Sequence, residues 1–414
     1  MLVTDNKQTE QFIDLENQYG AHNYHPLPVV LSKGKGVYVW DVEGKKYYDF
    51  LSAYSAVNQG HCHPKIIDAL INQAQKLTLT SRAFFNDKLG EYEKYLSDLF
   101  GFDKVLPMNT GAEAVETALK ICRKWAYEKK GIPENQAQII VCENNFHGRT
   151  TTIISFSNDE NATKNFGPFT NGFIKIPYNN ANALKEVLEN NSNIAGFLVE
   201  PIQGEAGVFV PDENYLSQCN ALCKQHNVLF IADEIQTGIA RTGKMLAIDH
   251  ENIQADILIL GKAISGGVYP VSAVLANNEI MNCIKPGNHG STFGGNPLAA
   301  TVAMAALDVV KDENLEQNAE YLGKIFREKL TEFIQTNDLV TLVRGKGLLN
   351  AIVINDSEES STAWDICIAL KNNGLLAKPT HGNIIRFAPP LVMTEIEILD
   401  CISIIIETIT NFKK

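Results

Sequence analysis

The sequence of 414 residues has no run of 18 apolar residues and no apolar segment near its N-terminus of the kind that a signal peptide needs. Its first twenty residues, MLVTDNKQTEQFIDLENQYG, are polar and acidic, and they lack the arginine-rich amphipathic pattern of an organelle transit peptide. Internal repeats and low-complexity segments are also missing. We therefore predict a cytoplasmic protein that does not associate with membranes.

Positive charge is scarce, since 36 Lys and Arg residues stand against 48 Asp and Glu residues, for a net charge of −12. A nucleic-acid-binding surface needs clustered Lys and Arg to meet phosphates, so we expect no nucleic-acid partner. Hydrophobic residues make up 45% and charged residues 20% of the chain, as in ordinary globular proteins. The length fits two or three domains, which large α/β enzymes can merge into one core.

Cysteine pairs at metal or redox spacing are missing. The eight cysteines are scattered and none forms a CxxC motif. His61 and His63, in the stretch HCH, have no third ligand nearby in the sequence. We therefore predict reduced cysteines that pack in the core, and no metal site.

What is present in the middle of the chain is a series of apolar runs without alternation. These runs are QIIVCENN (138–145), IAGFLVEPI (194–202), VLFIADEI (228–235) and DILILGK (256–262). Helical patterns over 112–130 and 214–227 lie between them. Strands that are apolar throughout are typical of a mostly parallel α/β sheet that is covered on both faces. Because chemistry in such sheets takes place at the carboxyl ends of the strands, the polar residues there are the candidates for a site.

The two ends of the chain have other patterns. Residues 36–55 predict an antiparallel hairpin that turns at Glu43-Gly44. From about residue 305 onward, helical patterns alternate with short strands such as LLNAIVI (348–354). We expect residues 1–50 to pack with a small α+β domain at 305–414, and residues 51–304 to form the large domain.

Two of the apolar runs end in charged residues. Lys262 follows one run and precedes Gly266 and Gly267. A buried lysine can have a lowered pKa and act as a nucleophile toward an aldehyde. Asp233 ends another run, where a carboxylate needs a partner such as an arginine, a metal or a protonated heterocycle.

Two further motifs are ambiguous when each is taken alone. Thr110, Gly111 and Ala112 precede a helical pattern, as a phosphate-binding helix N-terminus or a plain helix cap would. The stretch FHGRT (146–150) is either a ring-stacking platform beside a carboxylate-binding arginine or a solvated loop. Together with the lysine and the aspartate, however, these motifs match one cofactor, pyridoxal 5′-phosphate.

Between Tyr19 and Pro390 the sequence also resembles the class III aminotransferases. The stretches that carry the resemblance are YGAHNYHPLPVVL, LSAYSAVNQGHCHP, LTLTSRAF, VEPIQGEAG, DEIQTGIARTGK, HGSTFGGNPLAA, RGKGLLNAIVI and NGLLAKPTHGNIIRFAPPL. The resemblance implies the aspartate-aminotransferase fold, which is fold type I of the pyridoxal-phosphate enzymes. This fold has a large domain with a mostly parallel seven-stranded sheet and a smaller α+β domain.

The resemblance also implies which residues hold the cofactor. Lys262 would form the Schiff base, and Asp233 would pair with the pyridine nitrogen as the second catalytic residue. The remaining cofactor-binding residues would be Gly111 and Ala112 at the phosphate, Thr292 of a neighbouring subunit at the same phosphate, Phe146 stacked on the ring and Gln236 at the ring hydroxyl.

For the substrate, the resemblance implies that Tyr24 and Arg149 bind the carboxylate that lies far from the reacting amine. Tyr54 would help to select ornithine, and Glu205 and Arg386 would form a switchable ion pair. His147 departs from the tryptophan of animal members of the family, which changes the local shape beside the ring.

The implied reaction is the transfer of the 5-amino group of ornithine to 2-oxoglutarate by a ping-pong mechanism, in a homodimer with shared active sites. Acetylornithine and 4-aminobutyrate aminotransferases are alternatives within the family. Tyr24, Tyr54 and Glu205 together favour ornithine. An alternative from another class is a regulator that binds pyridoxal phosphate without turnover, but the joint presence of Lys262, Asp233 and Arg149 speaks against it.

Overall fold

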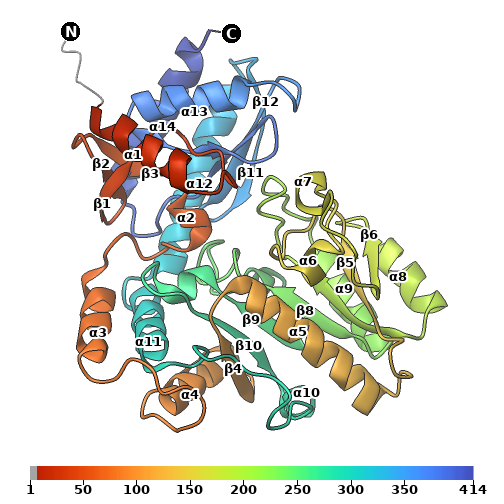
Figure 1. The fold of residues 1–414 in the computed structure, drawn as a ribbon. Coiled ribbons are helices and arrows are strands. Elements are labelled where there is room, and N and C mark those ends of the chain that lie inside the picture. Colours follow the sequence, from red (N-terminus) through yellow and green to blue (C-terminus); the bar gives the residue numbers. More distant parts are fainter. Residues whose placement is uncertain (1–6, 414) are drawn as a thin grey trace.

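A computed structural model describes residues 7–413 of the chain (Figure 1). Residues 1–6, which belong to the predicted N-terminal segment, and residue 414, at the end of the predicted small domain, lie outside the described residues. Within residues 7–413, no helix has both the length and the apolar character needed to cross a membrane.

A seven-stranded sheet forms the centre of the molecule, with the strand order β4-β10-β9-β8-β7-β5-β6. The strands are β4 (Lys104–Met108), β5 (Gln138–Cys142), β6 (Phe173–Ile176), β7 (Ile194–Val199), β8 (Leu229–Asp233), β9 (Ile257–Leu260) and β10 (Ser272–Ala276). Strand β10 runs antiparallel to both of its neighbours, and the other pairs are parallel. The predicted mostly parallel sheet is therefore confirmed.

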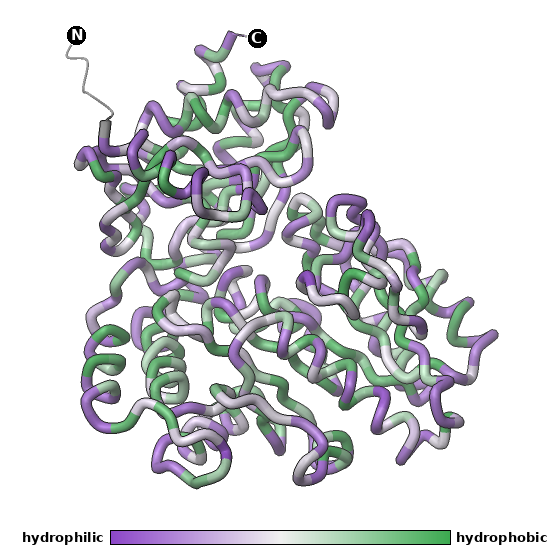
Figure 2. The backbone as a smooth tube through the Cα atoms, in the orientation of Figure 1, coloured by the Kyte–Doolittle hydropathy of each residue, from purple (hydrophilic) through white to green (hydrophobic). Residues whose placement is uncertain are grey.

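Both faces of this sheet are buried, which explains why its strands are apolar throughout. In β9, Ile257 and Ile259 belong to one apolar cluster, whereas Leu258 and Leu260 belong to the cluster on the opposite face. Since successive side chains of a strand point to opposite faces, a strand covered on both sides needs an apolar residue at every position. Figure 2 shows these central strands mostly in the hydrophobic colour, with hydrophilic residues concentrated toward the outside.

Two smaller sheets lie beside the central one. The first has the order β1-β2-β3-β13, and the second has the order β11-β12-β15-β14. Their strands are β1 (Leu31–Lys35), β2 (Tyr38–Asp41), β3 (Lys46–Asp49), β11 (Val340–Lys346), β12 (Leu349–Ile354), β13 (Leu375–Leu376), β14 (Lys378–Pro379) and β15 (Ile384–Phe387). Strands β2 and β3 form the predicted antiparallel hairpin, in which Gly44 has a φ of 86°. Because β3 pairs with β13, strands from both ends of the chain share one sheet (Figure 1).

The helices cover the sheets and connect them. The α-helices are α1 (Lys7–Tyr19), α2 (Ser52–Ser55), α3 (Pro64–Ala74), α4 (Leu89–Phe100), α5 (Gly111–Trp125), α6 (Thr151–Ile154), α7 (Glu160–Thr163), α8 (Ala181–Asn190), α9 (Tyr215–Gln225), α10 (Asn278–Met281), α11 (Pro297–Asp312), α12 (Leu315–Ile334), α13 (Thr362–Asn372) and α14 (Glu395–Asn411). The predicted helix over 112–130 consists of α5 followed by a π-helical turn, η1 (Ala126–Lys130).

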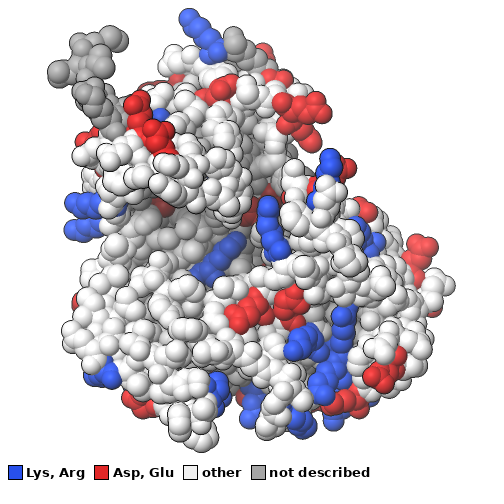
Figure 3. All heavy atoms as spheres, in the orientation of Figure 1, with Lys and Arg blue, Asp and Glu red and all other residues white. Residues whose placement is uncertain are grey.

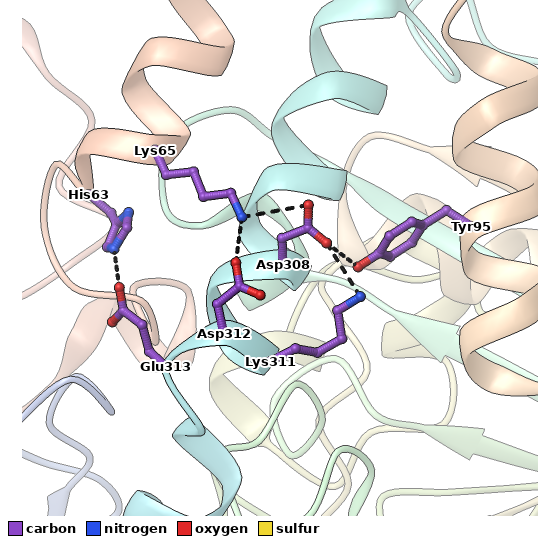
Figure 4. Close-up of polar contacts among 7 residues, drawn as sticks. All are labelled: His63, Lys65, Tyr95, Asp308, Lys311, Asp312 and Glu313. Atoms are coloured by element: carbon purple, nitrogen blue, oxygen red, sulfur yellow. Dashed lines mark hydrogen bonds and ion pairs between the residues drawn. The ribbon is translucent and has the colours of Figure 1, made fainter.

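Helices α3 and α4 are joined to α11 by polar side chains (Figure 4). Lys65 Nζ lies 2.7 Å from Asp312 and 3.7 Å from Asp308, which also accepts a hydrogen bond of 2.7 Å from the hydroxyl of Tyr95. Lys311 Nζ lies 3.3 Å from the same Asp308. Ion pairs at such exposed positions contribute little to stability, so the apolar packing beneath them holds these helices together.

The two histidines of the HCH stretch contact different carboxylates. His61 Nε2 lies 2.7 Å from Asp49, and His63 Nε2 lies 2.8 Å from Glu313 (Figure 4).

All eight cysteines are unpaired, and seven of them are buried. Cys62 is exposed, so the prediction that the cysteines pack in the core is wrong at this position.

Arg241 joins the large central part of the molecule to the C-terminal part. Its side chain is fully buried and donates to Asn58 Oδ1 at 3.2 Å, to the carbonyl of Leu348 at 3.0 Å and to that of Pro389 at 2.6 Å. Burial lowers the pKa of Arg241 to about 9. A buried guanidinium requires such partners, so these contacts fix the position of the C-terminal strands relative to the central sheet.

Candidate active site

A cavity of about 190 Å³ lies at the carboxyl ends of β7, β8 and β9. It is lined by Gly111, Ala112, Phe146, His147, Gly148, Glu200, Ile202, Asp233, Ile235, Gln236, Thr237 and Lys262. Glu200 directly follows β7, Asp233 is the last residue of β8, and Lys262 follows β9 after one glycine. Open α/β sheets bind their ligands at this edge.

Lys262 does not lie in the strand itself. Strand β9 ends at Leu260, and Lys262 begins the 3-10 turn η3 (Lys262–Ser265) with a φ of 45°. Neighbouring atoms enclose its side chain, although part of its surface faces the cavity. Burial lowers the pKa of the amine to about 8. At pH 7 about a tenth of the amine is therefore neutral, and so nucleophilic, which is far more than for a lysine with the usual pKa of about 10.4.

Asp233 is held in position by two hydrogen bonds. Its Oδ1 accepts the backbone N–H of Ile235 at 3.1 Å, and its Oδ2 accepts Nδ1–H of His147 at 2.6 Å. His147 is buried, and its other ring nitrogen, Nε2, has no partner among the described residues. Burial alone would lower the pKa of His147, but the hydrogen bond to Asp233 and its charge outweigh burial and raise it. The imidazole thus orients the Asp233 carboxylate toward the cavity edge where β8 ends.

His147 and Glu200 were not identified as residues of the site from the sequence alone. His147 was treated only as a departure from a family pattern, and Glu200 was not considered. Glu200 accepts the backbone N–H of Phe146 at 2.9 Å, and burial raises its pKa to about 8. Its position directly after a buried apolar strand is the same signal that identified Asp233, and it could have identified Glu200 as well.

The N-terminus of α5 forms one wall of the cavity. Thr110 Oγ1 accepts the N–H of Glu113 at 3.2 Å, while the side chain of Glu113 returns to the backbone of Thr110 in a capping box. A Cβ atom on Gly148, which has a φ of 128°, would lie 2.9 Å from the Cβ of Ala112. Gly148 therefore allows the loop after β5 to approach Gly111 and Ala112. These residues begin α5, and the free backbone N–H groups of a first helical turn can bind an anion.

A second cavity, of about 420 Å³, lies next to the first and shares Phe146, His147 and Gly148 with it. Its lining includes Arg149 and Glu205. Residues from the C-terminal part of the chain, Glu358, His381 and Ile384, complete the wall. Figure 3 shows the hollow between the upper and lower parts of the molecule, with basic side chains around it.

Glu205 and Arg386 form an ion pair with a distance of 2.8 Å between Oε1 and Nη1. Gln236 Nε2 donates to the same Oε1, also at 2.8 Å. Burial would raise the pKa of Glu205, but the charges of Arg386 and Lys262 outweigh it and lower this pKa to about 2. Arg386 Nε is buried and has no partner among the described residues, so the guanidinium keeps a donor for a further acceptor.

Of the remaining predicted site residues, Tyr54 lies beside this ion pair, whereas Tyr24 and Thr292 are exposed. Arg386 Cζ lies 5.0 Å from the centre of the Tyr54 ring, and Tyr54 is close enough to Tyr24 and Arg149 for both to affect its pKa. Burial and the charge of Glu205 raise the pKa of Tyr54. Tyr24 is 69% exposed. Thr292 is exposed and lies outside the lining of both cavities in the described part of the chain.

The family model for class-III aminotransferases matches residues 19–409. The chain belongs to this family. The ornithine aminotransferase of Drosophila melanogaster, which is named mitochondrial, is 62% identical over 96% of this chain and 90% of its own length. The ornithine aminotransferase of Schizosaccharomyces pombe is 58% identical over 99% of this chain and 95% of its own length.

Solved structures of family members have the same fold. An acetylornithine aminotransferase from Elizabethkingia anophelis is 67% identical, with a TM-score of 0.91 over 98% of this chain and 99% of that chain. The ornithine aminotransferase of Toxoplasma gondii is 51% identical, with a TM-score of 0.95 over 97% of this chain and 95% of that chain. The expected fold type I architecture is therefore confirmed.

Class-III aminotransferases use pyridoxal 5′-phosphate, and the inner cavity fits this cofactor. It brings together a lysine amine with a lowered pKa, an oriented carboxylate, the aromatic side chain of Phe146 and a helix N-terminus. When bound, pyridoxal phosphate supplies a carbonyl group that captures amines and a ring that accepts electrons. The chain would contribute the nucleophile, the partner of the ring nitrogen and the anion site.

We expect borohydride reduction of the protein loaded with pyridoxal phosphate to attach the cofactor to Lys262, which peptide mass spectrometry would identify. Burial lowers the pKa of Lys262 to about 8. When cofactor-free protein is treated briefly with pyridoxal phosphate and borohydride, the labelling of Lys262 should therefore rise with pH and reach its midpoint near this value. Lys65, whose pKa is raised by its hydrogen bond to Asp312, is the control and should require a higher pH. Attachment of the cofactor to another lysine would contradict the assignment.

Proposed function

We propose that this chain transfers the 5-amino group of L-ornithine to 2-oxoglutarate, giving L-glutamate 5-semialdehyde and L-glutamate in two half-reactions at one site. The observation that carries the proposal is the pairing of Arg386 with Glu205, while Arg149 lines the outer cavity and has no ion-pair partner among residues 7–413. One arginine is thus available for a carboxylate, and the other is neutralised. Relatives from the fly, the rat and yeast that are named ornithine aminotransferases support this activity.

In the proposed reaction, Lys262 moves a proton between the reacting carbon of the substrate and the cofactor. Asp233, oriented by His147, keeps a proton on the ring nitrogen, and a charge-assisted hydrogen bond of this kind is about twice as strong as a neutral one. Phe146 would cover one face of the ring. Gln236, whose amide donates to Glu205, would contact the ring hydroxyl.

The phosphate is proposed to bind at the amides of Gly111 and Ala112, with Thr292 of the partner subunit. On the substrate side, Tyr24 and Arg149 bind the α-carboxylate of ornithine. Tyr54 is proposed to face the free α-amine of ornithine, since a hydroxyl can accept a hydrogen bond from an ammonium group.

Acetylornithine is the second candidate substrate, because the structure of the Elizabethkingia anophelis acetylornithine aminotransferase is 67% identical to this chain. The two substrates differ at the α-nitrogen, which is a cation in ornithine and a neutral amide in N-acetylornithine. Glu205 lines the outer cavity and lies close to Tyr54, and its negative charge would favour the cation.

The purified holoenzyme should convert ornithine with 2-oxoglutarate to glutamate 5-semialdehyde, and its kcat/KM for ornithine should exceed that for N-acetylornithine by at least about tenfold, as expected for the loss of one charge-assisted contact. Identification of the aldehyde product by mass spectrometry distinguishes the two reactions, with 4-aminobutyrate as a third amino donor. A preference for N-acetylornithine would replace the proposed substrate.

The ion pair also explains how one site would accept two different amino donors. Ornithine must present its 5-amino group, whereas glutamate must present its α-amino group. A free Arg386 would attract the α-carboxylate of ornithine and bring the wrong amine to the cofactor. Glu205 is proposed to prevent this by occupying Arg386 until a dicarboxylate displaces it. The contact in the structure is made through one guanidinium nitrogen rather than the bidentate fork that the strongest such pairs use, which favours exchange.

We expect Glu205→Ala to slow the half-reaction with ornithine, to speed the half-reaction with glutamate and to increase attack at the α-amine of ornithine. The loss of the carboxylate leaves the charge of Arg386 open to any α-carboxylate, so the ratio of the two half-reaction rates should change by about tenfold or more. Single-turnover absorbance of the bound cofactor measures each half-reaction separately.

Glu358→Ala is the matched control, because Glu358 also lines the outer cavity. This control should leave the ratio of the half-reaction rates close to that of the wild type. Equal slowing of both half-reactions in Glu205→Ala would mean that Glu205 has a structural role only.

The proposed arrangement of domains follows from the same active site. We propose that residues 1–50 and 305–414 form one small domain, and that residues 51–304 form the large cofactor-binding domain. The outer cavity is lined by residues of both of these domains.

We also propose a cytoplasmic location. The fly and rat relatives are named mitochondrial, but the yeast relative is not.

A homodimer with shared active sites is proposed from the surface near Thr292. Phe293 is 50% exposed, and Phe84 and Phe85 are 73% and 103% exposed. Their two loops lie close together, because a Cβ atom on Gly295 would be 3.3 Å from Arg82 Nη1. Clustered exposed aromatic residues support a protein–protein contact at this surface.

We expect Lys262→Ala and Thr292→Arg to be nearly inactive alone and to regain activity in mixed dimers. If Thr292 acts in the partner's site, random pairing leaves about a quarter of all sites intact, one in every mixed dimer. Co-expression with two different affinity tags, followed by assay of the doubly tagged species, measures this. An active monomer in sedimentation analysis would contradict the proposal.

A further inference from the structure

The segment from Ser52 to Ser55, helix α2, turns in the left-handed sense. The φ angles of Ser52, Ala53, Tyr54 and Ser55 are 47°, 46°, 59° and 72°. The ψ angles of Ala53 and Tyr54 are 49° and 42°. Residues other than glycine are strained here, because Cβ comes too close to the following carbonyl oxygen, and they adopt this conformation singly rather than in series. Strain of this extent persists only where the surrounding structure imposes it.

The left-handed turn lies at the centre of the molecule, between the C-terminal part and the central sheet (Figure 1). It places the ring of Tyr54 at 5.0 Å from Arg386 Cζ. On its other side it contacts η3, the turn that begins with Lys262. Gln59, a few residues further along the chain, donates to the carbonyl of Ala263 in η3 at 2.9 Å. The turn therefore lies against both Arg386 and the segment that begins with Lys262.

One buried carboxylate holds the beginning of the turn. Asp49 Oδ1 accepts the backbone N–H groups of Leu51 at 2.8 Å and Ser52 at 2.9 Å. Its Oδ2 lies 2.7 Å from His61 Nε2. Asp49 is the last residue of β3, so it is itself fixed by pairing with Leu376 of β13. All these contacts oppose relaxation of the turn toward a right-handed conformation.

We propose that Asp49 is a positioning residue that keeps Tyr54 over Arg386 by holding the left-handed turn, and that it thereby contributes to the choice between ornithine and dicarboxylate substrates. The proposal rests on the proposed function, in which Tyr54 and Arg386 distinguish these substrates. With the turn in place, the Tyr54 ring covers one side of the guanidinium while Glu205 occupies one of its nitrogens. Relaxation of the turn removes the ring and opens Arg386 to the α-carboxylate of ornithine.

The test compares Asp49→Ala, Asp49→Asn and the double variant Asp49→Ala/Ala53→Gly in the holoenzyme. In Asp49→Ala we expect the ratio of the ornithine to the glutamate half-reaction rate to fall about tenfold, which corresponds to the loss of charged hydrogen bonds. Asp49→Asn retains an oxygen for both N–H groups and should retain most of the ratio. Single-turnover absorbance measures both rates.

The double variant distinguishes a held turn from a general loss of structure. Ala53 is exposed, and glycine adopts the left-handed conformation without steric strain, so Ala53→Gly should restore much of the ratio lost in Asp49→Ala. Asp41→Ala is the matched control. Asp41 is a buried carboxylate of the same sheet that binds the N–H of Lys45 at 2.8 Å and the hydroxyl of Tyr47 at 2.6 Å. Its loss should lower stability without changing the ratio.

His61→Ala provides the test if Asp49→Ala does not fold, since it frees Oδ2 but leaves both backbone contacts of Asp49 in place. It should shift the ratio in the same direction by a smaller factor. An unchanged ratio in every folded variant, or no restoration by Ala53→Gly, would overturn the proposal. Failure of the wild-type enzyme to use ornithine would instead overturn the proposed function, so the two failures are distinguishable.

Discussion

The contact between Glu205 and Arg386 links the two parts of the chain that build the active site. Arg386 lies in β15, and Glu205 lies in the loop after β7, whose backbone carbonyl at Glu205 accepts a hydrogen bond of 2.6 Å from Thr380. Because the pKa of Glu205 is lowered to about 2, protonation near neutral pH cannot open the pair. A competing carboxylate can open it, which makes the pair sensitive to the charge of the substrate rather than to the acidity of the solution. Without Glu205, Arg386 Nη1 would keep only two neutral acceptors, the Gly204 carbonyl at 3.3 Å and Gln236 Oε1 at 3.4 Å. A buried guanidinium without a counter-charge is unfavourable, so an incoming carboxylate is expected to take the place of Glu205.

The same charges act on Lys262. Burial lowers the pKa of its amine, the charge of Arg386 lowers it further, and the charges of Glu205 and Asp233 oppose this change. In the proposed exchange, a substrate carboxylate takes the place of Glu205 beside Arg386, so a negative charge would face this guanidinium in both half-reactions. Gln236 adds a direct link, since its amide lines the cofactor cavity and also donates to Glu205.

The apolar runs of the sequence predicted strands β5, β7, β8 and β9, because a strand that is buried on both faces must be apolar at every residue. Strands β4 and β6 were not predicted, since each is partly exposed and lacks such a run. The charged residues that end these runs, Asp233 and Lys262, follow from the same pattern. Contacts that depend on the three-dimensional path of loops could not be predicted in this way. His147 reaches Asp233 only because the loop after β5 folds over the end of β8, and the residue types of FHGRT do not encode that path. The left-handed turn was also not foreseen, since its residues include no glycine and so lack the usual signal for a positive φ.

Two of the strained segments of the backbone lie beside the proposed reacting groups, and they contact each other. Lys262 has a φ of 45° and begins η3, against which the left-handed turn at Tyr54 packs. Gln59 ties this unit to the core, because its amide donates both to Ala263 in η3 and to the carbonyl of Ala306 in α11 at 3.1 Å. A backbone that is fixed in this way on two sides restrains Lys262 and Tyr54 relative to each other. In the proposed mechanism, discrimination between the two amino donors then requires only the side chain of Glu205 to move, which is a smaller rearrangement than the closure of a loop or a domain.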